Sequence, residues 1–170
     1  MEQILRAAAY AKVADGTEVA ELLNATRGPA IGSNLSIATG RLAAGVCSAV
    51  HFHPLVTQIT YVQTGRLSLW MREPNAAKPY QVTAEPGNAA VTQPGTLLQL
   101  RNDSQVPTSV LYLVTPGYLR ELDAAGQVLF DDAVIAGPSW DSLARTQLEP
   151  RALRAFTLQR AELHARLYKA

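Results

Sequence analysis

Residues 45 to 65 read GVCSAVHFHPLVTQITYVQTG, and this stretch carries the pattern that decides the fold. His51 and His53 stand two residues apart in an apolar run, and alternate side chains of a strand share one face. We therefore expect both imidazoles to point the same way. An antiparallel strand that begins near Thr57 would bring Gln58 opposite them. Two imidazoles and an amide oxygen form a ligand set that borderline divalent metals accept.

The segments on either side of this stretch favour β structure as far as residue 137. Short runs rich in Val, Leu, Ile, Thr and Tyr alternate with Gly, Pro, Asn and Asp at close intervals. Many short strands with turns between them are typical of an antiparallel sandwich or barrel. Gly65 and Gly95 are expected to take the positive φ of tight turns. The expected strands span residues 9–13, 19–23, 35–41, 47–53, 58–63, 67–72, 80–83, 89–92, 97–101 and 109–114.

The periodicity becomes helical near residue 138. Ser139 is suited to cap a short helix through Leu143, and Pro150 to open a longer one that runs to the end. We interpret Asp131 and Asp132, which precede this change, as a solvated turn. The longer helix should pack against the barrel or a second subunit through one apolar face. That face comprises Leu153, Phe156, Leu163 and Leu167.

The chain is thus divided into three parts within one domain of 170 residues. Residues 1–34 supply strands that pack on the barrel or on a dimer partner, residues 35–137 form the barrel, and residues 138–170 form a C-terminal helical extension. Fifteen basic and fourteen acidic side chains argue against a nucleic-acid partner. No apolar run approaches the roughly 20 residues that span a bilayer, and no signal peptide is visible. We expect a cytoplasmic protein without a membrane partner.

The spacing in the opening stretch resembles the first signature motif of the cupin superfamily. That motif runs Gly, five residues, His-x-His, four residues, an acidic residue, six residues, Gly. Gly45, His51, His53 and Gly65 hold matching positions, and Gln58 stands where the family usually has Glu. The resemblance implies an all-β, cupin-type antiparallel double-sheet barrel, jelly-roll-like, with C-terminal helices. It also implies that both histidines are metal ligands and that Gln58 is a substituted third ligand.

A second stretch is similar to the other cupin motif but departs from it at one position. Gly87 begins the stretch, Gly95 lies at its turn and Asn102 ends it. Leu98 stands where the family places a third metal-binding His. Gln99 is adjacent, and it is a candidate replacement ligand if a β-bulge turns it inward.

Other residues are candidates for the pocket wall. Cys47 has the parity of the histidines and is interpreted as a small buried apolar residue. Val62, Leu98 and Leu100 make the predicted wall apolar, which favours a hydrophobic or aromatic substrate. Tyr112 is a candidate catalytic hydrogen-bond donor, but its parity is not fixed by the sequence.

These features favour a metal-dependent cupin enzyme that acts on a small organic molecule. The resemblance implies a dioxygenase, isomerase, lyase or cyclase type of reaction, with Fe, Mn, Zn, Ni or Co as the divalent transition metal. The alternative is a non-catalytic cupin module that binds a small molecule at a degenerate metal site. Edge strands must be covered or paired, and cupins are commonly dimers, so a homodimer is expected.

Overall fold

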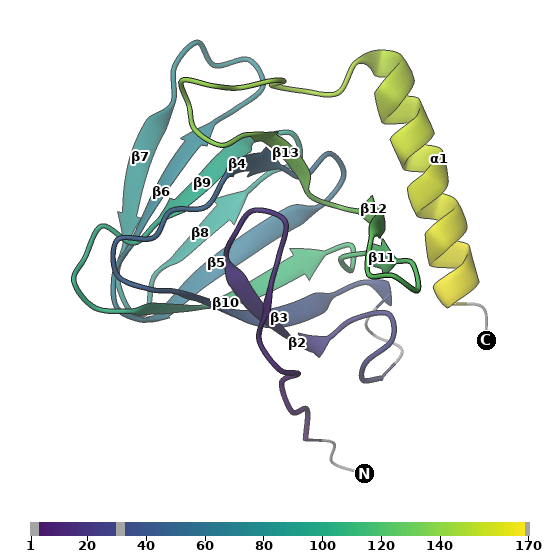
Figure 1. Cartoon of the computed structure of the whole chain (residues 1–170), viewed down its shortest axis with the longest axis horizontal. Coiled ribbons are helices and arrows are strands. Elements are labelled where there is room, and N and C mark those ends of the chain that lie inside the picture. Colours follow the sequence, from purple (N-terminus) through teal and green to yellow (C-terminus); the bar gives the residue numbers. More distant parts are fainter. Residues whose placement is uncertain (1–3, 30–32, 169–170) are drawn as a thin grey trace.

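The alternating apolar runs form two antiparallel sheets that face each other in a computed structural model, which describes residues 4–29 and 33–168 (Figure 1). The larger sheet contains, in spatial order, β1 (Ala11–Lys12), β2 (Glu18–Leu23), β3 (Ser36–Leu42), β10 (Thr108–Thr115), β5 (Thr57–Thr64) and β8 (Ala89–Thr92). The smaller sheet contains β13 (Val134–Gly137), β4 (Val50–Phe52), β9 (Leu97–Arg101), β6 (Leu67–Arg72) and β7 (Tyr80–Ala84). The predicted antiparallel double-sheet barrel is confirmed.

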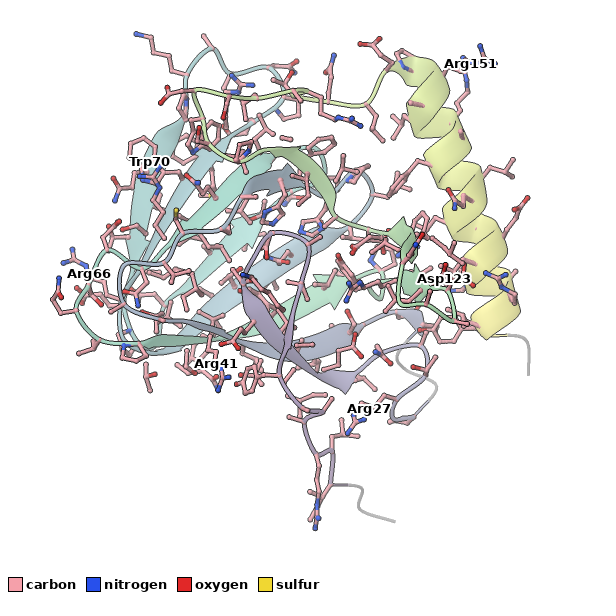
Figure 2. The ribbon with its side chains drawn as sticks, viewed as in Figure 1. Arg27, Arg41, Arg66, Trp70, Asp123 and Arg151 are labelled. Carbon is pink, nitrogen blue, oxygen red and sulfur yellow. The ribbon has the colours of Figure 1, made fainter. Side chains whose placement is uncertain are left out.

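Side-chain alternation follows the predicted parity along the strands that face the barrel interior. On β5, Gln58, Thr60 and Val62 are buried, whereas Tyr61 is exposed on the outer face. The interior is mainly apolar, while the labelled Arg41 and Arg66 lie on the outside (Figure 2). The main core joins both sheets and comprises Leu42, Val62, Leu67, Leu69, Met71, Ala84, Leu98, Leu100, Val110 and Tyr112.

The strands β1 to β10 each overlap a run that the sequence predicts. Gly65 joins β5 to β6 with a φ of +77°, which confirms the predicted left-handed turn. A Cβ at this position would lie 2.7 Å from the carbonyl oxygen of Pro107, so space as well as conformation requires glycine. Residues 1–34 contribute β1 and β2, and β2 extends the larger sheet by pairing with β3.

One predicted strand pairing is wrong. β5 was expected to follow the histidine strand as its antiparallel neighbour, but β4 lies in the smaller sheet and pairs with β9 and β13. Residues 53–56 carry the chain across to the larger sheet, where β5 pairs with β10 and β8. Gln58 therefore approaches the histidines from the facing sheet, not from an adjacent strand.

The segment after residue 115 differs from the prediction. It contains β11 (Arg120–Leu122) and β12 (Val128–Asp131), which form a separate hairpin, and then β13. The short helix expected after Ser139 does not form. Instead, the backbone N–H groups of Ala144 and Arg145 donate to the carbonyl oxygen of Ala136, at 2.7 and 3.3 Å. These bonds fold residues 139–145 back onto β13, so the segment makes turns.

Pro150 opens the one helix of the described chain, α1 (Pro150–Leu167), as the sequence predicts. Leu163 is buried against Leu119 and Phe130, and Phe156 and Leu167 pack around them. The helix therefore lies along the β11–β12 hairpin and not against a sheet face (Figure 1). Leu153, assigned to the same apolar face, is exposed. No helix among residues 4–29 and 33–168 has the length and hydropathy needed to span a membrane.

Candidate functional site

A cavity of about 150 Å³ lies inside the barrel and is lined by residues of both sheets. β2, β3, β5 and β10 form the wall on one side, and the histidines of the β4 segment lie on the other. The loop between β1 and β2 contributes Asp15 to the lining and lies in front of the sheets in Figure 1. The loop is attached to the smaller sheet because Ala49 N–H donates to Asp15 O at 2.7 Å.

His51 and His53 both point into this cavity, as their shared parity predicts. Both side chains are buried, and their ring centroids lie 5.4 Å apart in an edge-to-face arrangement. His51 Nδ1 lies 3.1 Å from the carbonyl oxygen of Ala49, and His53 Nδ1 lies 3.3 Å from that of Asp132. A carbonyl oxygen only accepts, so each Nδ1 carries the proton. In a neutral ring with this tautomer the lone pair is on Nε2, which is then the atom free to bind a ligand.

The Nε2 atom of His53 is buried and has no hydrogen-bond partner in the described structure. Burial, reinforced by the neighbouring His51, lowers the pKa of His53 to about 3 from its ordinary value of 6.5. The imidazole is thus neutral throughout the physiological range. A buried acceptor without a partner costs free energy unless something else occupies it. The pair of rings therefore presents an uncharged nitrogen donor to the cavity.

Gln58 reaches the same cavity from β5. Its side chain is buried, and its Nε2 donates to Thr60 Oγ1 at 3.2 Å. This bond directs the amide so that Oε1, a hard oxygen acceptor, is the atom left for a ligand. The structure thus brings His51, His53 and Gln58 to one cavity, although from two different sheets.

A carboxylate that the sequence did not single out stands beside the histidine pair. Asp15 Oδ2 lies 3.8 Å from His51 Nδ1, while its Oδ1 accepts from the backbone N–H and the hydroxyl of Thr17 at 2.9 and 2.7 Å. The Thr17 bonds fix the carboxylate, and its charge favours the Nδ1–H form of His51. No spacing in the sequence joins residue 15 to residue 51, so only the loop closure brings them together.

Tyr118, Arg120 and Asp131 form a second polar group at the cavity that the sequence did not reveal. The ring of Tyr118 lies edge-on to His53 at 5.8 Å, and its hydroxyl donates to Asp131 Oδ1. Arg120 Nε lies 3.3 Å from Asp131 Oδ2, without the alignment of a hydrogen bond. Burial, with the Asp131 carboxylate, raises the pKa of Tyr118 well above its ordinary value, so this phenol keeps its proton.

The interpretation of Asp131 and Asp132 as a solvated turn is wrong. Asp132 is fully buried and forms an ion pair with Arg160 of α1, with 2.8 Å between Oδ1 and Nε. Asp131 lies at the cavity. Burial raises the pKa of both carboxyls above their ordinary values, against the hydrogen bonds that lower it. The cause of the error is that α1 covers this segment, and the Arg160 partner lies 28 residues away in sequence.

Tyr112 faces the barrel interior, which settles the parity that the sequence left open. Its side chain lines the cavity, and its hydroxyl is buried without a partner in the described structure. Burial, with a smaller contribution from the Asp15 carboxylate, raises the pKa of Tyr112, so the hydroxyl remains protonated. It is therefore available as a hydrogen-bond donor to whatever occupies the cavity.

Several residues assigned to the pocket lie elsewhere. Leu100 does line the cavity, whereas Val62 and Leu98 are packed inside the core beneath it. Cys47 is exposed, because it precedes β4 and makes only an isolated bridge to Arg101. Its assignment as a buried wall residue is wrong.

Gln99 does not replace the missing third histidine. It has the parity opposite to Leu98, and Leu98 is the residue that pairs with His51 across β4 and β9. Its Nε2 donates to the carbonyl oxygen of Ser48 at 2.8 Å, and its Oε1 accepts from Arg101 Nε at 2.9 Å. The β-bulge that this role would require is absent from the paired stretch of β9 and β6, which runs without a register shift.

The side chains at the cavity determine whether a metal ion fits there. No three side chains of His, Cys, Asp or Glu come together as metal ligands within the described ranges. The unpartnered Nε2 of His53, the matching tautomer of His51 and the oxygen of Gln58 nevertheless form a suitable neutral donor set. The cavity lining adds three carboxylates, from Asp15, Glu21 and Asp131, against the single guanidinium of Arg120. This excess of negative charge favours a cation.

Comparison with known proteins gives matches at the level of structure. No protein-family model and no curated protein matches the chain. Peruvianin-I, described as a cysteine peptidase from Thevetia peruviana latex, is 16% identical over 74% of this chain and 70% of its own, with a TM-score of 0.58. The CENP-C cupin domain of Drosophila melanogaster is 13% identical over 63% of this chain and 70% of its own, with a TM-score of 0.52.

An oxalate oxidase also has this architecture. It is 20% identical over 65% of this chain and 56% of its own, with a TM-score of 0.53. Proteins as different as an oxalate oxidase and the CENP-C cupin domain share the barrel, so the likeness concerns fold alone. Together with the two facing antiparallel sheets and the His-x-His strand, it shows that the chain has the fold of the cupin superfamily.

Proposed function

We propose that this protein is a metal-dependent enzyme that acts on a small organic molecule inside the barrel. The observation that carries the proposal is the buried, unpartnered Nε2 of His53, beside a second imidazole fixed in the same tautomer. His51, His53 and Gln58 would hold a divalent transition metal. When bound, such an ion supplies Lewis acidity to a carbonyl or enolate oxygen.

The residues around this donor set divide the remaining work. Tyr112 offers its protonated hydroxyl as a hydrogen-bond donor to a substrate oxygen. Asp15 orients His51 through its Nδ1 side. Tyr118 keeps its proton and donates it to Asp131 in a hydrogen bond beside His53, which holds the ring next to the imidazole. Each of these side chains is already in position in the folded protein before any substrate binds, which favours catalysis through preorganisation.

The size of the cavity limits the substrate. A volume of about 150 Å³ accommodates a molecule of roughly the size of benzene. The lining combines apolar side chains, Leu100 and Val114 among them, with the hydroxyl of Tyr112. We therefore favour a small substrate that has one apolar or aromatic face and at least one acceptor oxygen.

Metal content is the experiment that tests this proposal. Elemental mass spectrometry of the untagged protein should find near-stoichiometric metal, and His51→Ala and His53→Ala should each lose it. His164→Ala is the matched control, because it removes the third histidine of the chain, which lies on α1 and does not line the cavity. Protein that stays free of metal after incubation with Fe, Mn, Ni, Zn and Co would overturn the metal-dependent reading.

The alternative, a non-catalytic small-molecule binding module, has one specific observation in its favour. Leu98 stands opposite His51, where a third imidazole would complete the site, and Gln58 brings no charge. Incubation with a library of small phenols, keto acids and hydroxy acids separates the two functions. An enzyme should deplete one compound and lose this turnover in His53→Ala, whereas a binding module should retain one compound unchanged.

A further inference from the structure

The hydrogen-bond partner of His53 belongs to a segment that is held by the C-terminal helix. His53 Nδ1 donates to the carbonyl oxygen of Asp132 at 3.3 Å, and this bond selects the tautomer with a free Nε2. The position of the Asp132 backbone therefore determines how well the ring is oriented. Residues outside the cavity hold that backbone in place.

Asp132 is fixed from two directions. Its N–H donates to Leu119 O at 3.0 Å, and its Oδ2 accepts from Leu119 N–H at 2.7 Å. From α1, Arg160 donates through Nε to Oδ1 at 2.8 Å and through Nη2 to Oδ2 at 3.0 Å. This is a bidentate guanidinium–carboxylate pair, which constrains direction as well as distance. The acceptor of His53 is thus tied to the helix by two charged hydrogen bonds.

Arg160 also reaches the other neighbour of His53. Its Nη2 donates to the carbonyl oxygen of Gly117 at 2.7 Å. Gly117 directly precedes Tyr118, whose ring lies edge-on to His53 at 5.8 Å. The Arg160 guanidinium therefore holds Asp132, which accepts a hydrogen bond from His53, and also the residue next to Tyr118, whose ring contacts His53. Arg160 is buried, with 8% of its surface exposed, so solvent does not compete for these bonds.

A second ion pair on the same helix provides a contrast. Arg166 Nη2 lies 2.7 Å from Glu121 Oε1, but its side chain is 61% exposed. It also joins α1 to the β11–β12 hairpin, whose tip carries Asp123 beside the helix (Figure 2). An exposed pair of this kind contributes little. Arg166 thus connects α1 to the β11–β12 hairpin, whereas Arg160 connects it to the residues that flank the hairpin, and only Arg160 reaches the partner of His53.

From these contacts we infer that α1 is part of the functional site and that Arg160 is a positioning residue, which acts through Asp132 to hold His53 in its metal-binding tautomer. The part that concerns metal rests on the proposed function. The part that concerns the tautomer does not, because Nδ1–H of His53 is a property of the protein alone.

The tautomer is measured by long-range ¹⁵N–¹H NMR of the histidine rings in chelator-treated protein. Wild type should show His53 as a single neutral form with Nδ1 protonated. Arg160→Met keeps the buried stem but removes the donors, so it should give a mixture of tautomers. Arg166→Met, the matched control on the same helix, should leave the His53 signals unchanged. An unchanged single tautomer in Arg160→Met would overturn the inference.

Metal affinity is the second readout, with Co²⁺ as the probe because its visible bands report coordination by nitrogen. Loss of an outer partner of a ligating histidine typically weakens metal binding by about 10- to 100-fold. We expect that loss in Arg160→Met, a smaller loss in Arg160→Lys, which keeps the charge but not the fork, and none in Arg166→Met. Equal Co²⁺ affinity in Arg160→Met and wild type would contradict a positioning role.

Unfolding of the Arg160 variant and failure of the metal proposal must each be distinguished from failure of the positioning role. Arg160→Met leaves the Asp132 carboxylate buried without its cation, so the variant is at risk of unfolding. The double variant Asp132→Asn/Arg160→Met removes both charges, retains an acceptor for Leu119 N–H, and should fold while showing the same tautomer mixture. If wild type binds no Co²⁺ but the tautomer changes as expected, the proposed metal function fails and the positioning role of Arg160 stands.

Discussion

The ring of Tyr112 lies directly against Gly40, and no other residue type leaves room for it there. A Cβ built at position 40 would come within 2.9 Å of both Cζ and the hydroxyl oxygen of Tyr112. Tyr112 pairs with Ala38 on β3, so Gly40 is its diagonal neighbour two residues along the strand. The missing side chain lets the ring lie along β3 and keeps its hydroxyl inside the barrel.

Gly40→Ala should therefore displace the Tyr112 ring. The added methyl group enters a filled space between strands, and overpacking of this kind typically costs about 1 to 3 kcal/mol. Urea denaturation should show that loss in the free energy of unfolding. In the background of Tyr112→Leu the same substitution should cost much less, because the clashing ring is gone. Additive effects in this double-mutant cycle would contradict the contact.

Tyr112→Phe should behave differently in stability and in ligand binding. The hydroxyl is buried without a partner, and an unsatisfied polar group costs about 1 to 3 kcal/mol. Its removal should leave the free energy of unfolding unchanged or raise it by about 1 kcal/mol, while affinity for an oxygen-bearing ligand falls. Tyr61→Phe, on the outer face of the barrel, is the control and should change neither. A clear loss of stability in Tyr112→Phe would show that the hydroxyl has an internal partner.

Stability should depend on pH through His53. Its pKa is lowered to about 3 in the folded protein by burial and by the neighbouring His51, against 6.5 in the unfolded chain. Below pH 6.5 the unfolded state binds a proton that the folded state does not, so the contribution is complete above pH 6.5 and is lost as the pH falls toward 3. Between pH 7 and pH 4.5 this amounts to about 2 to 3 kcal/mol.

The comparison with His53→Gln isolates this contribution from the carboxyl groups that titrate in the same range. Urea denaturation of chelator-treated protein at several pH values should give a smaller loss of stability in His53→Gln than in wild type. His164→Gln, which removes a histidine from α1, should follow wild type. Parallel pH profiles of wild type and His53→Gln would contradict a neutral buried His53.

Most of the barrel follows from local sequence, since strand alternation and turn residues act over a few positions. The Gly45–Gly65 frame and the parity of His51 and His53 needed only the period of a β-strand. The short strands β11, β12 and β13 were not predicted, and α1 proved to cover their hairpin. A run of three or four residues carries too little periodicity to be recognised, and it becomes a strand here because of its partners.

The site was predictable only where strand parity decides it. Parity placed His53 and Gln58 in the interior, but Gln99 would have needed a bulge, which the register of β9 excludes. Asp15 and Asp132 depend on contacts across 36 and 28 residues, made by a loop and a helix that no local pattern positions. Contacts of this kind form only when the whole chain folds, and they leave no pattern in the spacing of residues along the sequence.

Asn102, which ends the second motif-like stretch, has a structural role that is evident from its hydrogen bonds. It is fully buried, and its Nδ2 lies within 3.1 Å of three carbonyl oxygens, those of Leu42, Ala43 and Val106. Its Oδ1 accepts from the N–H and the hydroxyl of Ser104, at 3.1 and 2.7 Å. One amide therefore joins the end of β3 to the loop that leads into β10.

Asn102→Ala should thus destabilise the barrel without altering the proposed metal site. One buried and several half-buried polar groups lose their partner at once, and a loss of about 3 kcal/mol in the free energy of unfolding is expected from urea denaturation. Asn88→Ala is the matched control, because the exposed Asn88 side chain accepts a single bond, from Glu85 N–H at 3.1 Å, and its loss should cost under about 1 kcal/mol. Metal content of folded Asn102→Ala should equal that of wild type, since neither His51 nor His53 contacts this amide. A variant that keeps its stability but loses metal would place Asn102 in the site after all.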